Sequence, residues 1–259
     1  MAERRWEDLN CDCLALVFER VGLKHLMLDV PLVCKSWYKA HLSPGCWKNL
    51  DFRFANDFSF GSSYTNLIKF AVSRSCGTAT MVALPNDCTF EDLNYISEEC
   101  KALKILIVPY LDATPKQRQC IPELIAKLNY LENLGICGVE LNKIVTQIGI
   151  HCSNFVGLFI NSSIHFDEAT SIVTNLPKIK HLSLRNCSLP RECLIQILNG
   201  CRDLVLFDVR GCIGFDEDDE EILKLASHIK DFRPQGSMLY DDYYETGADY
   251  EDFTGNGSD

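Results

Sequence analysis

A short apolar pattern that recurs along the chain is the feature that most constrains its fold. The pattern has the form L-x-x-L-x-L, with an apolar residue at each leucine position. Five copies are regular: Leu103-Leu106-Val108, Leu131-Leu134-Ile136, Phe155-Leu158-Ile160, Ile179-Leu182-Leu184 and Leu204-Phe207-Val209. Two less regular copies precede them, at Leu50-Phe52 and Val82-Leu84. Self-similarity at a nearly fixed period indicates a repeat architecture.

The spacing of these copies identifies the class of repeat. Their central residues fall at positions 50, 82, 106, 134, 158, 182 and 207, and the intervals from position 82 onward are 24, 28, 24, 24 and 25 residues. Such intervals are typical of leucine-rich repeats. One repeat cannot bury the inward side chains of its strand alone, so neighbouring repeats must stack. We therefore expect an α/β fold that contains a short solenoid, with a curved parallel sheet and helices outside it.

Each repeat pairs its strand with a predicted helix. The helices are expected at residues 64–75, 90–99, 115–128, 141–150, 167–175, 190–199 and 218–228. Thr114 followed by Pro115 suits a helix start, and Pro190 is expected at a first helical position. We assign residues 51–233 to about six or seven leucine-rich repeats.

Cysteine recurs at fixed places in the repeats. Three cysteines stand three residues ahead of the first apolar position, and two stand three residues after the last one: Cys100, Cys152 and Cys201, then Cys187 and Cys212. We expect each to fill a tight turn as a small buried apolar side chain. Metal sites need paired C-x-x-C or Cys/His spacing, which the sequence lacks, so we expect no metal and no cofactor. Scattered cysteines in a chain of 259 residues indicate reduced thiols.

Residues 4–50 are expected to form two or three short helices. A helix is predicted to start near Asp12, an acceptable N-cap, and Pro31 must break or begin an element. A further helix should place Val33 and Trp37, four residues apart, on one face. The first helix has its apolar face at Leu9, Leu14, Val17, Phe18 and Val21. So small a core usually needs a partner surface to be well stabilised.

This N-terminal segment resembles an F-box. The V-C-K-x-W core, with a second Trp about ten residues on, is among the more specific parts of that pattern. The residues that carry the resemblance are Trp6-Glu7-Asp8-Leu9, Leu14-Ala15-Leu16-Val17-Phe18, Pro31-Leu32-Val33-Cys34-Lys35-Ser36-Trp37 and Trp47-Lys48-Asn49-Leu50. The whole chain is similar to plant-type F-box proteins with Cys-containing leucine-rich repeats. One departure is Asn10, because F-boxes usually open with Leu-Pro and here Leu9 precedes Asn10.

The resemblance implies a role in ubiquitin ligation. The F-box would bind a Skp1-like protein and, through it, the cullin and RING subunits of an SCF E3 ubiquitin ligase. The chain would then be a non-catalytic substrate-recognition adaptor in protein degradation, located in the nucleus, the cytoplasm or both. The Skp1-binding residues implied are Leu9, Leu14, Val17, Phe18, Pro31, Val33, Cys34 and Trp37. An alternative is a leucine-rich-repeat scaffold whose F-box-like segment is only a cap for the solenoid.

A protein substrate is expected on the concave side of the sheet. Residues that alternate with the buried leucines face that side. Among them, Ile107 and Phe159 form a candidate apolar anchor, and His181, Arg185 and Arg210 a polar and basic rim. The alternative is that a loop or the C-terminal tail covers Ile107 and Phe159.

Other functions are disfavoured by charge and motif content. Residues 216–259 carry 14 acidic and 3 basic side chains, which accounts for the whole net charge of −11. We therefore expect no nucleic-acid binding. No apolar run is long enough to suggest a membrane span, and no phosphate-binding loop or nucleophile–histidine motif suggests an enzyme.

The last residues differ from the rest. Residues 236–259 mix acids, glycine and aromatics without periodicity, and we predict a disordered acidic tail. The tail either acts as a solvating segment, or it binds a basic partner or folds over Arg185 and Arg210.

Overall fold

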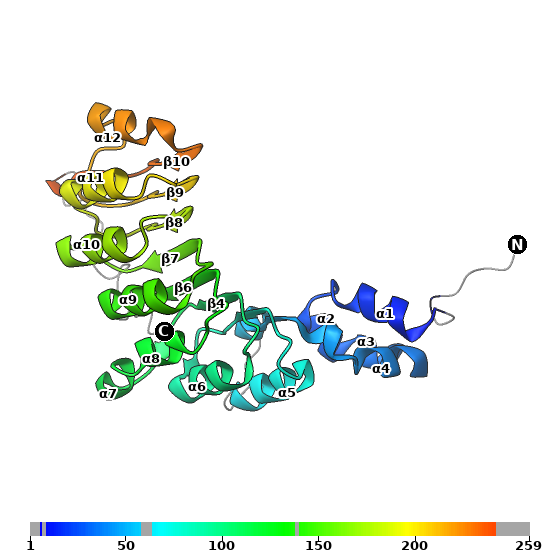
Figure 1. The fold of residues 1–259 in the computed structure, drawn as a ribbon. Helices are drawn as coiled ribbons and strands as arrows, with labels where there is room; N and C mark the ends of the chain where they lie inside the picture. The colour runs from blue at the N-terminus through cyan, green and yellow to red at the C-terminus, as the bar shows by residue number, and fades with distance from the viewer. Residues whose placement is uncertain (1–5, 7–8, 58–63, 138–139, 242–259) are drawn as a thin grey trace, which may run out of the picture. The chain divides into compact units, whose positions relative to one another are not determined.

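The computed structural model describes residues 6, 9–57, 64–137 and 140–241 (Figure 1). The chain forms two compact units. The first unit contains residues 1–136 and 151–155, and the second contains residues 137–150 and 156–259.

The first unit opens with short helices. They are α1 (Cys11–Phe18), α2 (Leu23–Leu28), α3 (Val30–Val33), α4 (Lys35–His41) and the 3-10 helix η2 (Pro44–Trp47). Asn10 caps α1, because its Oδ1 accepts the backbone N–H of Cys13 at 2.7 Å. The prediction that Asp12 caps this helix is wrong: Asp12 lies in the first turn. Asn and Asp are both good N-caps, so the pattern alone could not separate them.

The predicted single helix through Val33 and Trp37 is two helices. Helix α3 ends at Val33, and α4 begins at Lys35. Between them Cys34 is extended, with φ of −163° and ψ of 171°. Pro31 stands at the start of α3, where a missing backbone N–H removes no intrahelical hydrogen bond.

Parallel strands follow in the first unit. They are β1 (Asn49–Asp51), β2 (Met81–Ala83), β4 (Ile105–Val108) and β6 (Asn133–Cys137), side by side in that order. Leu50 pairs with Val82, Val82 with Leu106, and Leu106 with Leu134. These four are central residues of the predicted copies. The L-x-x-L-x-L spacing therefore predicted the strand register correctly here.

The remaining elements of this unit connect these strands. They are η3 (Phe52–Asp57), α5 (Thr65–Ser75), α6 (Phe90–Glu99), α7 (Pro115–Arg118), α8 (Ile121–Ala126) and a small ladder of β3 (Cys88–Thr89) with β5 (Leu111–Asp112). The helix predicted at 115–128 is broken into α7 and α8. Pro122 explains the break, because proline inside a helix lacks an N–H and its ring clashes with the preceding turn.

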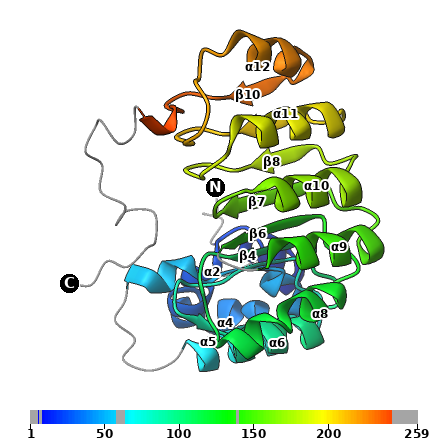
Figure 2. The same cartoon turned by 90° about the vertical axis from the view of Figure 1, so that its left-hand side faces the viewer.

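The second unit repeats the same arrangement. Its helices are α9 (Leu141–His151), α10 (Phe166–Asn175), α11 (Arg191–Gly200), α12 (Glu220–Leu225) and the 3-10 helix η4 (Ala226–His228). Its parallel strands are β7 (Gly157–Asn161), β8 (His181–Ser183), β9 (Leu206–Asp208) and β10 (Asp231–Arg233). Helices α10 and α11 lie on one side of these strands, and among the described residues none of the helices named above covers the other side, hereafter the open face (Figure 2).

The strands of the second unit are also in the predicted register. Leu158 pairs with Leu182, Leu182 with Phe207, and Phe207 with Phe232. Strand β10, which contains Phe232, was not among the pattern matches. Its copy reads Ile229-Phe232-Pro234, so a proline replaces the third apolar residue.

Two boundaries near the C-terminus differ from the prediction. The last helix begins at Glu220, after Asp219, whose side chain accepts the backbone N–H groups of Glu221 and Ile222. The predicted disorder from residue 236 is wrong for 236–241. Ser237 is buried, and Met238 bridges to Ile213. Residues 242–259 of the predicted tail lie outside the described residues.

The N-terminal helices and the first repeat share one core. Trp47 and Leu50 are fully buried. The Trp47 indole donates a hydrogen bond to the carbonyl of His41 at 2.7 Å, and its ring meets that of Phe70 edge-on, with centroids 5.7 Å apart. Within the described ranges, no helix is both long and apolar enough to cross a bilayer.

Candidate functional site

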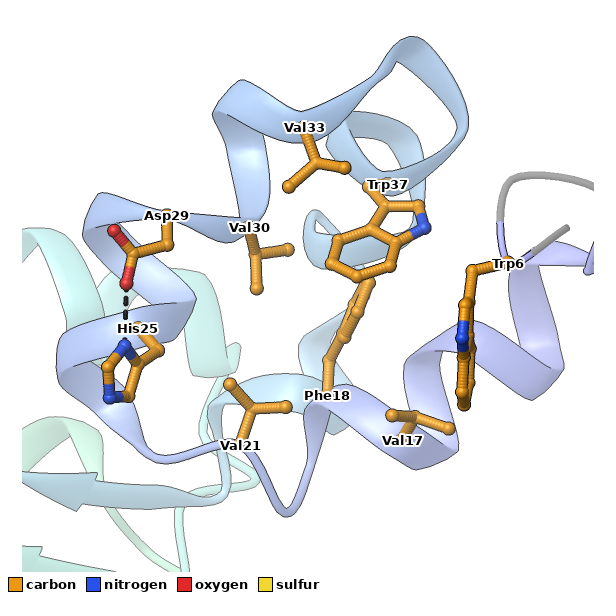
Figure 3. A pocket seen from close by; sticks show the side chains of 9 residues that line it. All are labelled: Trp6, Val17, Phe18, Val21, His25, Asp29, Val30, Val33 and Trp37. Atoms are coloured by element: carbon orange, nitrogen blue, oxygen red, sulfur yellow. Dashed lines mark hydrogen bonds and ion pairs between the residues drawn. The ribbon is translucent and has the colours of Figure 1, made fainter.

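A hollow in the N-terminal helices is the first candidate surface. We call it the N-terminal pocket. It has a volume of about 260 Å³ and is lined by Trp6, Val17, Phe18, Val21, His25, Asp29, Val30, Val33 and Trp37 (Figure 3). Val33 and Trp37 come from consecutive helices, α3 and α4, yet both line this hollow. The lining is mainly apolar, as a surface that receives an apolar partner would be.

The predicted Skp1-binding residues divide into two groups. Leu14 and Phe18 are buried, 0% and 1% exposed, so they belong to the core of the helices and not to its surface. Leu9, Val17 and Val33 are exposed, with Val17 at 38% and Val33 at 56%. Pro31, Cys34 and Trp37 are half-buried.

Aromatic packing supports the floor of the pocket. The rings of Phe18 and Trp37 meet edge-on with centroids 5.1 Å apart, a favourable geometry for aromatic pairs. The Nε1 of Trp37 is buried and has no hydrogen-bond partner among the described residues. An N–H left without an acceptor costs free energy. At the rim, His25 and Asp29 form an exposed i,i+4 pair 2.6 Å apart.

Asn10 stands where F-boxes usually have proline, and its backbone φ is close to the value that proline would impose. Asn10 has φ of −67° and ψ of 157°. Proline fixes φ near −65°, so Asn10 already has the angle that a proline would set. Its side chain adds an N-cap that proline cannot supply.

The open face of the second unit is the second candidate surface. Phe159, on β7, is 41% exposed. It stands in register with Ser183 on β8, which in turn pairs with Asp208 on β9. His181, two residues before Ser183, is half-buried on the same face. Arg185 and Arg210 belong to the same unit, so four of the five predicted substrate-binding residues lie in it. Ile107 lies on β4 of the first unit and is half-buried.

Arg185 and Arg210 do not form an independent basic rim, because both contact Asp208. The Nε and Nη2 of Arg210 donate to the two carboxylate oxygens of Asp208, at 2.9 and 2.6 Å. The Nε of Arg185 and the Nη1 of Arg233 each lie 3.9 Å from Oδ2 of the same carboxylate. We call Arg185, Arg210, Arg233 and Asp208 the arginine cluster.

Hydrogen bonds keep the central carboxylate charged. Burial alone would raise the pKa of Asp208, but the hydrogen bonds from Arg210 outweigh it and hold this pKa below its ordinary value. Asp231 behaves similarly, because the guanidinium of Arg233 binds both of its oxygens and lowers its pKa.

Sequence reasoning missed Asp208 and Arg233 as members of this cluster. A signal for them exists, because D-x-R occurs at the end of three strands: Asp51-Phe52-Arg53, Asp208-Val209-Arg210 and Asp231-Phe232-Arg233. In each, the Arg donates to both oxygens of the Asp two residues before it.

The repeat cysteines are buried, as predicted, and they also form hydrogen bonds. The Sγ of Cys212 donates to the carbonyl of Leu184 at 2.9 Å, and that of Cys152 donates to the carbonyl of Leu128 at 3.4 Å. Each thiol therefore joins one repeat to the one before it. Burial raises the pKa of Cys187 and Cys212 to about 12, so both stay protonated at neutral pH. In the part of the chain that the structure describes, no group of three or more His, Cys, Asp or Glu side chains is placed to hold a metal ion.

The chain is similar over most of its length to several F-box proteins of Arabidopsis thaliana. No family model matches the chain. The chain is 28% identical to F-box protein FBW2 of Arabidopsis thaliana over 269 aligned residues, which cover 95% of this chain and 84% of that protein. It is also 28% identical to F-box/LRR-repeat protein At3g48880 of the same plant, over 80% of this chain and 72% of that relative. F-box protein SKIP19, again from Arabidopsis thaliana, is 24% identical over 91% of this chain and 79% of its own length.

Proposed function

Because the chain belongs to the F-box/LRR-repeat family, we propose that it is the substrate-recognition subunit of an SCF E3 ubiquitin ligase. Its N-terminal helices would bind a Skp1-like protein, which links it to the cullin and RING subunits. Its repeats would bind the protein to be ubiquitinated. It would act as a non-catalytic adaptor in the nucleus, the cytoplasm or both.

The observation that carries this proposal is the apolar surface at the N-terminal pocket. Val17 and Val33 are exposed beside the half-buried Trp37. Exposed apolar side chains grouped around a hollow mark an interaction site more often than scattered ones do. A partner that brought an acceptor to Trp37 Nε1 would also remove the cost of its missing hydrogen bond.

The shared core between the N-terminal helices and the first repeat supports an adaptor role. Trp47 of η2 and Leu50 of β1 are fully buried, the Trp47 ring packs on Phe70 of α5, and only Lys48 separates η2 from β1. A direct connection restricts where a bound substrate can lie relative to the ligase. Such restriction raises the effective concentration of the acceptor lysine.

The test is capture by a purified Skp1-family protein. Wild-type chain is expected to form a complex on size-exclusion chromatography, and Val17→Asp with Val33→Asp should abolish it, because two charges would be buried at the contact. The matched control is Ile150→Asp on α9, which changes a 65% exposed apolar residue in the second unit. The control should bind as wild type does.

A leucine-rich-repeat scaffold is the alternative function. It predicts that the folded wild-type chain forms no complex with any Skp1-family protein. That result would overturn the adaptor proposal.

A further inference from the structure

In the second unit, the repeat of β8 has a serine where the repeats of β9 and β10 have an aspartate two residues before an arginine. In D-x-R, each Arg has its own carboxylate two residues before it, as in Asp208 with Arg210 and Asp231 with Arg233. The corresponding pair on β8 is Ser183 with Arg185. Ser183 pairs in register with Asp208, so the serine occupies the place that an aspartate occupies on the next strand.

Arg185 is consequently the least neutralised arginine of the cluster. Among the described residues its only ion pair is with Asp208, at 3.9 Å, and its side chain is 54% exposed. The side chain of Asp208 is 6% exposed, and it already accepts two hydrogen bonds from the guanidinium of Arg210. The cluster with Asp231 holds three guanidinium groups and two carboxylates, an excess of one positive charge.

The neighbouring side chains define what could complete this arrangement. A guanidinium offers paired N–H donors that match the oxygens of a carboxylate or a phosphate. Phe159 stands beside Ser183 in register, exposed on the same face. If an anionic side chain of a substrate segment binds Arg185, an adjacent residue of that segment can therefore lie over the ring of Phe159.

We propose that the arginine cluster binds an acidic side chain of the substrate, a carboxylate or a phosphorylated serine or threonine, with an adjacent apolar residue packed on Phe159. The proposal rests on the proposed function, because it names the class of segment that the adaptor recognises. Arg185 is the specificity-determining residue, and Arg210, Arg233 and Asp208 position it.

The test uses the full chain and three fluorescein-labelled peptides of one neutral sequence. Each peptide has a central serine, phosphoserine or glutamate next to a leucine. We expect at least one of the two anionic peptides to bind tenfold or more tightly than the serine peptide by fluorescence polarisation, with an affinity that falls as salt rises. The tighter of the two identifies the source of the charge. Equal binding of all three peptides, or no binding of any, would overturn the proposal.

Variants of the cluster separate recognition from folding. Arg185→Gln should lower the affinity for the anionic peptide about tenfold, and Arg185→Lys should restore part of it. Ser183→Asp should also abolish the preference, because it creates at β8 the D-x-R pair that β9 and β10 already carry. The control, Arg202→Gln, removes an exposed arginine from the loop before β9 and should bind as wild type. Unchanged preference in both Arg185→Gln and Ser183→Asp would refute the assignment.

Two comparisons exclude other readings of the result. Deletion of residues 242–259, which contain six acidic and no basic side chains, should leave the affinity unchanged. A rise of tenfold or more would assign the cluster to the chain's own tail instead. Capture of Arg185→Gln by a Skp1-family protein should equal that of wild type. If the chain binds anionic peptides selectively but no Skp1-family protein, the adaptor function fails and the peptide site stands.

Discussion

The carboxylate of Asp208 receives both guanidinium hydrogen bonds of Arg210, at 2.9 and 2.6 Å, although the two residues are only two positions apart. The same arrangement joins Asp51 to Arg53, at 2.9 and 2.7 Å. Asp231 and Arg233 both lie in β10 and face the same side of the strand, whereas Arg53 and Arg210 follow strands that end at Asp51 and Asp208. In all three pairs the arginine neutralises the aspartate two residues before it.

Asp208→Asn tests how much the cluster depends on this carboxylate. The change keeps the size of the side chain but removes the charge that three arginines share. We expect the free energy of unfolding to fall by about 2 kcal/mol, the usual effect of removing a charged hydrogen-bond partner from a buried site. Urea unfolding followed by far-UV circular dichroism measures it. Asp203→Asn, at an exposed site before β9, is the control and should be neutral.

The same variant also tests how the contribution of Asp208 to stability depends on pH. Since the pKa of Asp208 is lower in the folded chain than its ordinary value of 3.8, its contribution to stability is fully present above pH 3.8. It is lost as the pH falls through the folded pKa, below 3.8. The difference in unfolding free energy between wild type and Asp208→Asn should therefore be constant from about pH 7 to pH 5 and shrink in more acidic buffer. A difference that disappears by pH 6 would contradict the assignment.

The strand register could be predicted from the sequence because it depends on one repeated feature. Apolar residues that recur every 24 to 32 residues can all be buried only if the strands align. Leu50, Val82, Leu106 and Leu134 do so in the first unit. Strand β10 escaped the prediction because Pro234 replaces an apolar residue, and the break at Pro122 was missed because the apolar period continues through it.

The candidate sites were less predictable, because exposure depends on packing. Leu14 and Val17 both fit an apolar helix face, yet only Val17 reaches the surface. The arginine cluster joins three strands that are far apart in sequence. Its members meet only once the register has brought Ser183, Asp208 and Arg233 side by side.

The contrast between Leu14 and Val17 gives a third prediction. Leu14→Ala should destabilise the first unit by about 2–5 kcal/mol, because it leaves a cavity in a closed core. Val17→Ala should change stability by less than about 0.5 kcal/mol and still weaken capture by a Skp1-family protein. The three tryptophans of the chain, Trp6, Trp37 and Trp47, all lie in the first unit, so their fluorescence reports on its unfolding. Equal effects of the two substitutions on unfolding would contradict the division into core and surface.

A fourth prediction concerns the packing of α10 against α11. A methyl group at Gly200 would lie 2.2 Å from Cγ1 of Val173 on α10, and a valine in a helix has little rotamer freedom to move away. Alanine gains at most about 1 kcal/mol in helix propensity over glycine. Overpacking costs about 1–3 kcal/mol, so Gly200→Ala should lower the melting temperature in far-UV circular dichroism. Asn199→Ala, one residue earlier and exposed, is the control. A melting temperature for Gly200→Ala at or above that of wild type would show that the two helices pack less closely.

The last prediction uses the cysteines as reporters of local opening. Burial raises the pKa of Cys187 and Cys212 to about 12, so at pH 8 roughly one in ten thousand of these thiols is ionised even before access is considered. Cys11 and Cys76 are exposed. Iodoacetamide at pH 8 should therefore modify Cys11 and Cys76 in the native chain and leave Cys187 and Cys212 unmodified until urea unfolds the repeats, as peptide mapping by mass spectrometry can measure. Because alkylation of a buried thiol requires the surrounding structure to open, its rate reports the local stability of that repeat. Modification of Cys212 as fast as Cys76 in the native chain would show that the repeats around β9 are open in solution.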